Sequence, residues 1–347
     1  MKSDKQLQRD VLDERETSPS ETLMGDFILF AGTANPALVG AIAAELGVRP
    51  GACAIERFPD GETAVRLDES VRGRDVFVVQ PTAPPVNDHL VELLAFADAC
   101  RRSAAARVTA VVPYFGYARS DRRHGRREPI TASLVAQLMQ AAGIDQVVTL
   151  DLHAAQIEGF FHIPVESLTA VPTLCRALRD RLPSGAVVVS PDTGRVAMAT
   201  DYAHRLGTSV VVLHKRRASG TVTEVTHVVG DVAGRACLII DDMIATGGTI
   251  AQAVEALLAA GARPEITVAA THGLFVGAAR AKLGHEAIRE VLVTDTVARA
   301  DRPWPPLQIV SVAPLLAEAI RRILADGSLG DLFQDASCPV PTASAAR

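Results

Sequence analysis

The sequence predicts an α/β fold of two tandem domains, each a mostly parallel sheet flanked by helices. Short runs of β-branched and aliphatic residues alternate with longer segments rich in alanine and leucine. Several runs are apolar throughout, as in VFVVQ (76–80), which is typical of strands buried on both faces. Such alternation favours right-handed crossovers and parallel strands. Because the runs are too many for one open sheet, we expect two sheets joined near residue 168.

The predicted strands of the first half lie at 27–32, 52–58, 76–80, 107–113 and 146–151. Those of the second half lie at 186–190, 209–214, 236–241, 266–272, 291–295 and 307–311. Helical spacing is visible between them, for example at 35–46 and 248–261. We expect domains at 25–168 and 169–306, a terminal strand and helix at 307–333 that packs on the first domain, and disordered tails at 1–24 and 334–347.

Composition excludes several classes of protein. A hydrophobic fraction of 48% supports a sizeable core, and a net charge of −5 argues against a surface that coats nucleic acid. No uncharged run reaches the roughly 18 residues of a membrane span. The five cysteines form no C-x-x-C pair, and the charged N-terminal segment does not look like a signal peptide. We therefore expect a cytoplasmic protein without membrane or nucleic-acid partners.

The segment 236–257 places a glycine-rich turn between a buried strand and a helix. Backbone amides of such a turn, together with the positive end of the helix, bind a phosphate group. Asp241 and Asp242 would repel phosphate but suit sugar hydroxyls or a metal ion, and two buried aspartates are costly without a ligand. An ordinary strand–turn–helix is the alternative. The pattern indicates a phosphorylated pentose bound by the turn residues Thr246, Gly247, Gly248 and Thr249.

IIDDMIATGGT within this segment resembles the phosphoribosyl-pyrophosphate loop of phosphoribosyltransferases and ribose-phosphate pyrophosphokinases. The resemblance implies tandem phosphoribosyltransferase-like domains. It also implies that Asp241, Asp242 and the loop from Ala245 to Thr249 bind ribose 5-phosphate. Ala245 stands where the pyrophosphokinases usually have aspartate.

Five arginines lie between Arg119 and Arg127, directly after three aromatic residues. Arginine forks suit polyphosphate oxygens, and an arginine plane can stack on a purine. A solvated basic turn and a nucleic-acid contact are the alternatives. PYFGYARSDRR (113–123) is similar to the ATP-site segment of the pyrophosphokinases, which implies ATP-binding roles for Arg119 and for Ser120, where the family often has glutamine.

Two residues at predicted strand ends are candidate metal ligands. His153 belongs to DLHAAQIEGFF (151–161), and the resemblance implies that it binds Mg²⁺, although a lone histidine is more often structural. Asp192 in SPDTG (190–194) suits a helix N-cap, and the resemblance makes it a second Mg²⁺ ligand as well. Arg195 replaces a glycine that is usual in the family and adds positive charge near the sugar-phosphate site.

Lys215, Arg216 and Arg217 follow a predicted strand, where three bases often form a solvated loop. They resemble the family's catalytic flexible loop, which implies catalytic roles for Lys215 and Arg217 and a ribose 5-phosphate contact for Arg217. A long mobile loop with such charges can close over bound phosphates. The continuation at 218–220 departs from the family's pattern.

The turn Asp60, Gly61 and Glu62 lies between two predicted strands, as in a plain hairpin. It also matches the family's segment that reaches the ATP of a neighbouring subunit. The resemblance therefore implies self-association, as a hexamer or another dimer-based assembly.

The resemblance to ribose-phosphate pyrophosphokinases covers residues 27–333. It implies a Mg²⁺-dependent transfer of the diphosphoryl group of ATP to ribose 5-phosphate. The sequence has no G-x-x-x-x-G-K-[ST] motif, so ATP would not bind at a P-loop. One alternative is a non-catalytic regulatory paralogue, motivated by the departures at Ser120, Arg195, 218–220 and Ala245. A phosphoribosyltransferase is the other, but it leaves the arginine-rich loop and the tandem first half unexplained.

Overall fold

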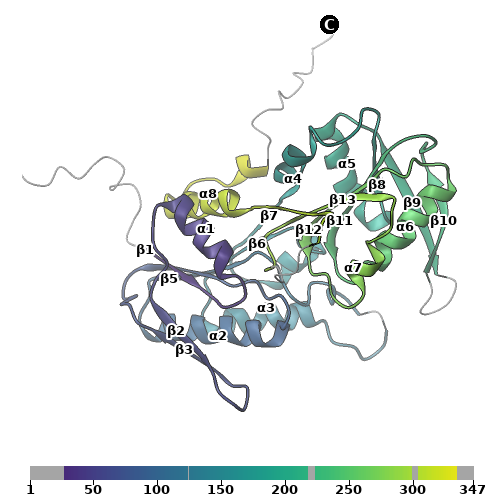
Figure 1. Ribbon diagram of the computed structural model, residues 1–347. Helices are drawn as coiled ribbons and strands as arrows, with labels where there is room; N and C mark the ends of the chain where they lie inside the picture. Colours follow the sequence, from purple (N-terminus) through teal and green to yellow (C-terminus); the bar gives the residue numbers. More distant parts are fainter. Residues whose placement is uncertain (1–26, 124, 218–222, 299–303, 334–347) are drawn as a thin grey trace, which may run out of the picture.

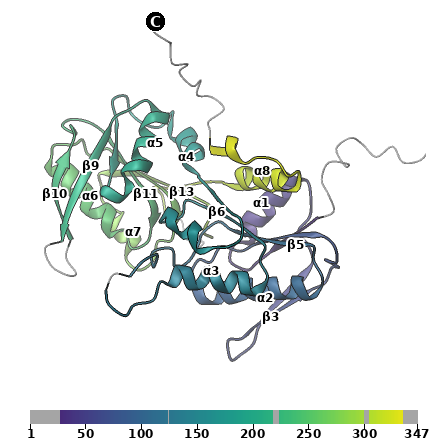
Figure 2. The same ribbon diagram turned by 180° about the vertical axis from the view of Figure 1, so that it is seen from behind.

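The computed structural model describes residues 27–123, 125–217, 223–298 and 304–333. The tails predicted at 1–24 and 334–347 lie outside these residues. Two largely parallel sheets with helices on both faces lie side by side (Figure 1), and the view from behind shows the same arrangement (Figure 2). The predicted fold class is confirmed.

The first sheet has the strand order β1-β4-β5-β6-β7, and every neighbouring pair is parallel. Helices α2 (Val86–Arg102) and α3 (Thr131–Ala142) cover one face, and α1 (Pro36–Leu46) covers the other. Both faces are thus buried, which explains strands that are apolar throughout. The strands are β1 (Phe27–Ala31), β4 (Asp75–Val79), β5 (Arg107–Val112), β6 (Gln146–Leu150) and β7 (Val165–Leu168).

The second sheet has the order β10-β9-β8-β11-β12-β13-β14, and only its edge strand β10 is antiparallel among the described strands of this sheet. Helices α4 (Val171–Leu178) and α5 (Val196–Leu206) lie on one face, with α6 (Gly248–Ala259) and the short α7 (Ala279–Lys282) on the other. The strands are β8 (Val187–Ser190), β9 (Val210–Arg217), β10 (Thr223–Val229), β11 (Cys237–Ile244), β12 (Ile266–Gly273), β13 (Ile288–Thr294) and β14 (Leu307–Val310).

The segment predicted at 307–333 is divided between the two halves of the molecule. Strand β14 pairs in parallel with β13 and completes the second sheet. Helix α8 (Ala313–Leu324) instead packs against α1 of the first half, where Leu316 and Ile320 join one core cluster with Leu38. A short 3₁₀ turn, η3 (Gly330–Phe333), follows. The packing of the strand on the first domain is therefore a wrong prediction, while the domain boundaries themselves stay predictions.

The carboxyl ends of the two sheets face each other and are joined by polar contacts. After β1, the Asn35 side chain donates to the carbonyl of Asp295, which follows β13, at 2.7 Å. Thr271 of β12 donates its hydroxyl to Asp151, which follows β6, at 2.5 Å. Ligands of open parallel sheets bind at such carboxyl ends. Within the described residues, no helix has the length and apolar character needed to cross a membrane.

Candidate functional site

A buried histidine joins the two sheets beneath the site. His272 in β12 contacts the carbonyl of Leu150 through Nε2 at 3.2 Å and the Thr296 hydroxyl through Nδ1 at 2.9 Å. A carbonyl only accepts, so Nε2 carries the hydrogen and Nδ1 accepts from the threonine. Burial lowers the pKa of His272 despite the nearby charges of Asp151 and Asp242, which favours the neutral ring that this pair of hydrogen bonds requires. These hydrogen bonds of His272 therefore hold the ends of β6 and β12 together beneath the site.

The glycine-rich turn lies where β11 meets α6, as predicted. Gly247 is the N-cap residue of α6 and has a φ of 70°, a left-handed conformation that favours glycine. A Cβ atom at this position would lie 3.3 Å from the carbonyl oxygen of Ala279. The turn lines a cavity of about 180 Å³, which collects residues from four loops: Arg119, His153, Asp192, Arg195, Asp241, Asp242 and 243–250. One cavity thus gathers the residues predicted to bind the pentose phosphate, except Arg217, which is not among its lining residues.

The pKa values of the two adjacent aspartates of β11 are shifted in opposite directions. Burial, and then the charge of Asp242, raise the pKa of Asp241 well above its usual value. Burial would raise the pKa of Asp242 too, but the hydrogen bonds from His153 and Asp241 and the charge of Arg195 bring it to about 2. The backbone N–H of Asp242 donates to Asp241 Oδ1 at 2.9 Å. The pair therefore presents one carboxylate and one readily protonated carboxyl group.

Arg195, at the end of the 3₁₀ turn η2 (Thr193–Arg195), contacts both Asp241 and Asp242 with its guanidinium group. Its Nε is 3.2 Å from Asp242 Oδ1 and 3.5 Å from Asp241 Oδ1. Its Nη1 donates to the His153 carbonyl at 3.1 Å, and its Nη2 lies 2.7 Å from His153 Nδ1. The sequence placed a positive charge near the sugar-phosphate site but did not reveal these partners.

The two predicted metal ligands line the same cavity. His153 Nδ1 lies 2.7 Å from Asp242 Oδ2, and Asp192 accepts from the Gly194 N–H at 2.9 Å, which confirms the N-cap. Among residues 27–123, 125–217, 223–298 and 304–333, no three His, Cys, Asp or Glu side chains cluster as a metal site. Because Mg²⁺ commonly keeps waters and takes substrate phosphates, this donor set fits an ion completed by substrate oxygens.

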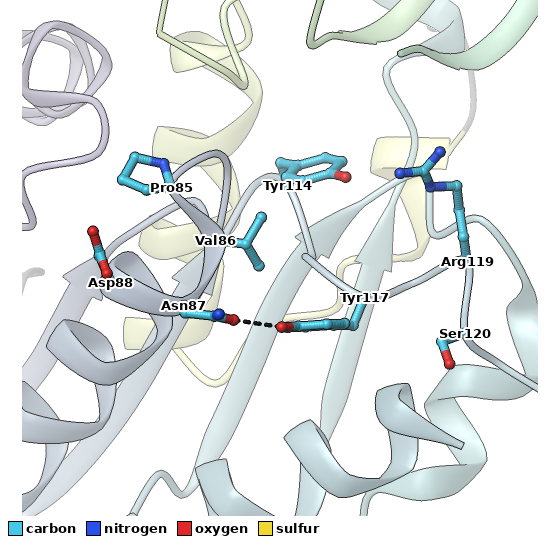
Figure 3. Close-up of a pocket in the computed structure, with 8 residues that line it drawn as sticks. All are labelled: Pro85, Val86, Asn87, Asp88, Tyr114, Tyr117, Arg119 and Ser120. Atoms are coloured by element: carbon cyan, nitrogen blue, oxygen red, sulfur yellow. Dashed lines mark hydrogen bonds between the residues drawn. The ribbon is translucent and has the colours of Figure 1, made fainter. Parts of the chain in front are cut away.

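A larger cavity of about 580 Å³ lies over the first sheet (Figure 3). It is formed by the loop before α2 and the loop after β5. The Tyr117 hydroxyl donates to Asn87 Oδ1, and burial raises the pKa of Tyr114. Arg119 lines this cavity and the smaller one, so the two adjoin at its side chain. The lining residues are Pro85, Val86, Asn87, Asp88, Tyr114, Tyr117, Arg119 and Ser120.

Ser120 lies in the wall of the larger cavity, with its hydroxyl already engaged. Its Oγ donates to the Thr131 hydroxyl at 3.2 Å and accepts from the Thr131 N–H at 3.3 Å. The Ala132 N–H donates to the Ser120 carbonyl at 3.1 Å. Ser120 therefore holds the arginine-rich loop to the start of α3, and its predicted ATP contact stays a prediction.

The predicted turn at 60–62 connects β2 (Cys53–Arg57) and β3 (Thr63–Leu67), an antiparallel hairpin, as expected. The Glu62 N–H donates to Asp60 at 3.1 Å, and Gly61 has a φ of 95°. The turn is exposed and lines neither cavity. An ion pair of 2.6 Å between Arg57 and Asp88 holds the hairpin beside the larger cavity.

Lys215 and Arg217 lie at the end of β9, whereas the sequence placed them in a loop after the strand. Lys215 pairs with Val225 and Arg217 with Thr223 in the antiparallel ladder of β9 and β10. The prediction missed this extension because basic residues are uncommon in buried strands, and here the strand is near the sheet edge. The continuation at 218–222 and the side chains of both residues lie outside the described part.

Two parallel sheets, with an aspartate pair and a glycine turn opening a helix, define a phosphoribosyltransferase-like α/β protein. The N-terminal domain of ribose phosphate pyrophosphokinase matches residues 27–143, and the phosphoribosyl synthetase-associated domain matches 221–334. The chain belongs to the ribose-phosphate pyrophosphokinase family.

Individual relatives match over nearly their whole length. The ribose-phosphate pyrophosphokinase of Gloeobacter violaceus is 45% identical over 329 residues, which cover 94% of this chain and 99% of that protein. The protein of that name from Rhodopirellula baltica is 46% identical over 316 residues, or 90% of this chain and 100% of the relative. The crystal structure of phosphoribosylpyrophosphate synthetase from Mycobacterium smegmatis matches with a TM-score of 0.82 and 44% identity, covering 87% of this chain and 100% of that one.

Proposed function

We propose that the protein is a ribose-phosphate diphosphokinase, which converts ATP and ribose 5-phosphate into 5-phospho-α-D-ribose 1-diphosphate and AMP. The single observation that carries this proposal is the pair of adjoining cavities that share Arg119. The names of relatives that are 44–46% identical support the same reaction. A phosphoribosyltransferase activity would not account for the larger cavity of the first half, because it gives that cavity no ligand.

Ribose 5-phosphate fits the smaller cavity. The amides of residues 246–249 and the N-terminus of α6 would hold its phosphate, since the first N–H groups of a helix have no partner within it and α6 has no side-chain cap. Asp241 and Asp242 would then accept hydrogen bonds from the ribose hydroxyls. A carboxyl with a raised pKa can also donate, so the pair offers both kinds of contact to a diol.

ATP fits the larger cavity, with its polyphosphate directed toward Arg119. Tyr114, Tyr117 and Pro85 provide partly apolar walls for the nucleoside. A neighbouring copy would add Asp60, Gly61 and Glu62 through its exposed hairpin turn, which makes the complete site a property of an oligomer.

Mg²⁺ would be held by His153 and Asp192 together with oxygens of the substrates. When bound, the ion supplies neutralisation of phosphate charge. The chain adds positive charge of its own at Arg119 and Arg195, which both line the smaller cavity.

In the reaction, O1 of the ribose would form a bond to the β-phosphorus of ATP. The bond between that phosphorus and the oxygen bridging to the α-phosphorus breaks, AMP leaves with the oxygen, and the O1 proton passes to solvent. Lys215 and Arg217 would stabilise the charge that develops on the transferred group. Such transfers depend on positioning and electrostatics, so no protein nucleophile is needed.

We place this reaction in the cytoplasm. No disulfide joins the described cysteines at 53, 100, 175 and 237, as is usual in a reducing compartment.

The experiment that tests the proposal incubates purified protein with ATP, ribose 5-phosphate and Mg²⁺ and measures AMP. We expect AMP formation that depends on ribose 5-phosphate and is lost in Lys215→Ala. If the wild type makes no more AMP than Lys215→Ala, the chain is a non-catalytic paralogue. The departures at Arg195 and Ser120, whose side chains are held by protein groups, favour that second candidate.

A further inference from the structure

Arg195 brings a full positive charge to the floor of the smaller cavity. Its side chain is only 14% exposed, and Asp242 is 2% exposed. Nε lies 3.2 Å from Asp242 and 3.5 Å from Asp241, while Nη1 donates to the His153 carbonyl at 3.1 Å. These contacts come from β11 and from the turn after β6, so the guanidinium is fixed by elements of both sheets.

Two groups lie within hydrogen-bonding distance of His153 Nδ1. It lies 2.7 Å from Arg195 Nη2 and 2.7 Å from Asp242 Oδ2. Arginine only donates and a carboxylate only accepts, whereas Nδ1 offers either a lone pair or one hydrogen. It therefore satisfies one neighbour at a time, and the three side chains have two alternative arrangements.

A divalent cation would use the same atoms that Arg195 contacts. Imidazole nitrogens and carboxylate oxygens are metal ligands, and here His153 Nδ1 and Asp242 Oδ1 lie 2.7 and 3.2 Å from nitrogens of the guanidinium. A second cation within a few ångströms would be repelled by the arginine. A glycine at this position would leave this space without the charge of Arg195.

We propose that Arg195 is a tethered cation that occupies the metal side of this cavity in the substrate-free protein. A divalent ion then binds appreciably only when ATP brings its own phosphate oxygens. Arg195 is a positioning residue in this proposal, because it acts through the two aspartates and His153. The ATP-dependent half rests on the proposed function, whereas the substrate-free half rests on the contacts of Arg195 alone.

The test measures Mn²⁺ binding to the full-length protein by electron paramagnetic resonance, without substrates. Arg195→Gly and Arg195→Gln remove the charge, and Arg195→Lys keeps it. Arg49→Gly removes the same charge from an 82% exposed loop side chain that does not line the cavity. We expect the two neutral variants to bind Mn²⁺ roughly tenfold more tightly or better, because a neighbouring charge shifts ionic equilibria by about 1–3 log units. Arg195→Lys and Arg49→Gly should bind as weakly as the wild type.

A second substitution locates the gained site. Adding Asp242→Asn to Arg195→Gln should abolish the gain. The glutamine variant retains most of the side-chain volume, so it answers the question if the glycine variant does not fold. The proposal is overturned if the wild type binds Mn²⁺ as tightly as the neutral variants, if neither neutral variant gains affinity, or if Arg195→Lys gains as much as they do. Because no substrate is used, these outcomes are independent of AMP formation.

Discussion

The two cavities that adjoin at Arg119 differ in size and in how they treat charge. The cavity over the first sheet, of about 580 Å³, is walled by tyrosines and a proline, and its ion pair between Arg57 and Asp88 is 50% and 37% exposed. The cavity at the second sheet, of about 180 Å³, buries its charges, with Asp242 only 2% exposed. Under the proposed function, the first would select its substrate by shape and apolar area, and the second by charge and hydrogen bonding.

Substitutions in the two cavities should therefore have different effects. Screening by water makes an exposed ion pair contribute little, while a buried charge that loses its partner is costly. Changes in the smaller cavity should therefore affect both binding and stability. Changes in the larger cavity should affect the binding of one substrate only.

The largest effect is expected for Arg119→Ala, because both cavities lose the same charge. We expect kcat/KM to fall roughly 100-fold with either substrate varied, since hydrogen bonds to charged groups contribute about 1.5–3 kcal/mol each. Steady-state rates of AMP formation measure this. Arg122→Ala, an exposed neighbour on the same loop that lines neither cavity, is the control. An effect confined to one substrate would show that the cavities act separately.

Asp242→Asn removes a buried charge from the smaller cavity, and its effect on stability should depend on pH. The pKa of Asp242 lies at about 2 rather than 3.8, so its stabilising contribution is present above pH 4 and is lost as the pH falls toward 2. We expect the variant to be less stable by about 1–2 kcal/mol at pH 7, since relief of Asp241 offsets part of the loss.

Urea unfolding at pH 7, 5 and 3 measures the difference, which should shrink at the lowest pH. Asp88→Asn in the larger cavity is the matched control, because its ion pair is exposed and contributes at most about 1 kcal/mol. Equal losses in the two variants would contradict the contrast between the cavities.

Gly247→Ala should weaken ribose 5-phosphate alone. The left-handed φ of 70° and the Ala279 carbonyl 3.3 Å from the added Cβ would distort the phosphate turn. We expect KM for ribose 5-phosphate to rise roughly tenfold, from a strain of about 1–2 kcal/mol, while KM for ATP stays unchanged. Gly234→Ala has a similar φ of 66° with nothing within 4 Å of its Cβ, so it controls for backbone strain.

The smallest effect is expected for Tyr117→Phe in the larger cavity. The variant loses the hydroxyl that donates to Asn87 and leaves the ring in place. KM for ATP should rise roughly threefold, as for one neutral hydrogen bond, and KM for ribose 5-phosphate should not change. A larger change for ribose 5-phosphate than for ATP would mean that the two substrates are assigned to the wrong cavities.

The sequence predicted what is encoded locally. The glycine-rich turn at 246–249 and the hairpin at 60–62 each lie in one continuous segment, where strand, turn and helix residues can be read together. The edge strand β7 escaped prediction because VESL lacks an apolar run, and its first three residues are only partly buried.

Contacts between segments that are distant in the chain could not be predicted from the sequence. Arg195 meets His153 and Asp242 only because the carboxyl end of β6 in the first sheet faces those of β8 and β11 in the second. The engagement of Ser120 by Thr131 likewise depends on how the arginine-rich loop folds back. Residue types showed that charge gathers near the site, and only the packed sheets show which charges touch.

The packing of α8 on α1 ties the last helix of the described chain to the first. Leu316 and Ile320 share a core cluster with Leu38 and Ile42, and Arg321 donates to the Glu45 carbonyl. During synthesis, the apolar side of α1 can therefore pack against α8 only after almost the entire chain has left the ribosome. We expect the first half, released alone, to bind chaperones through that uncovered helix, and a chain ending before residue 313 to be cleared by proteases.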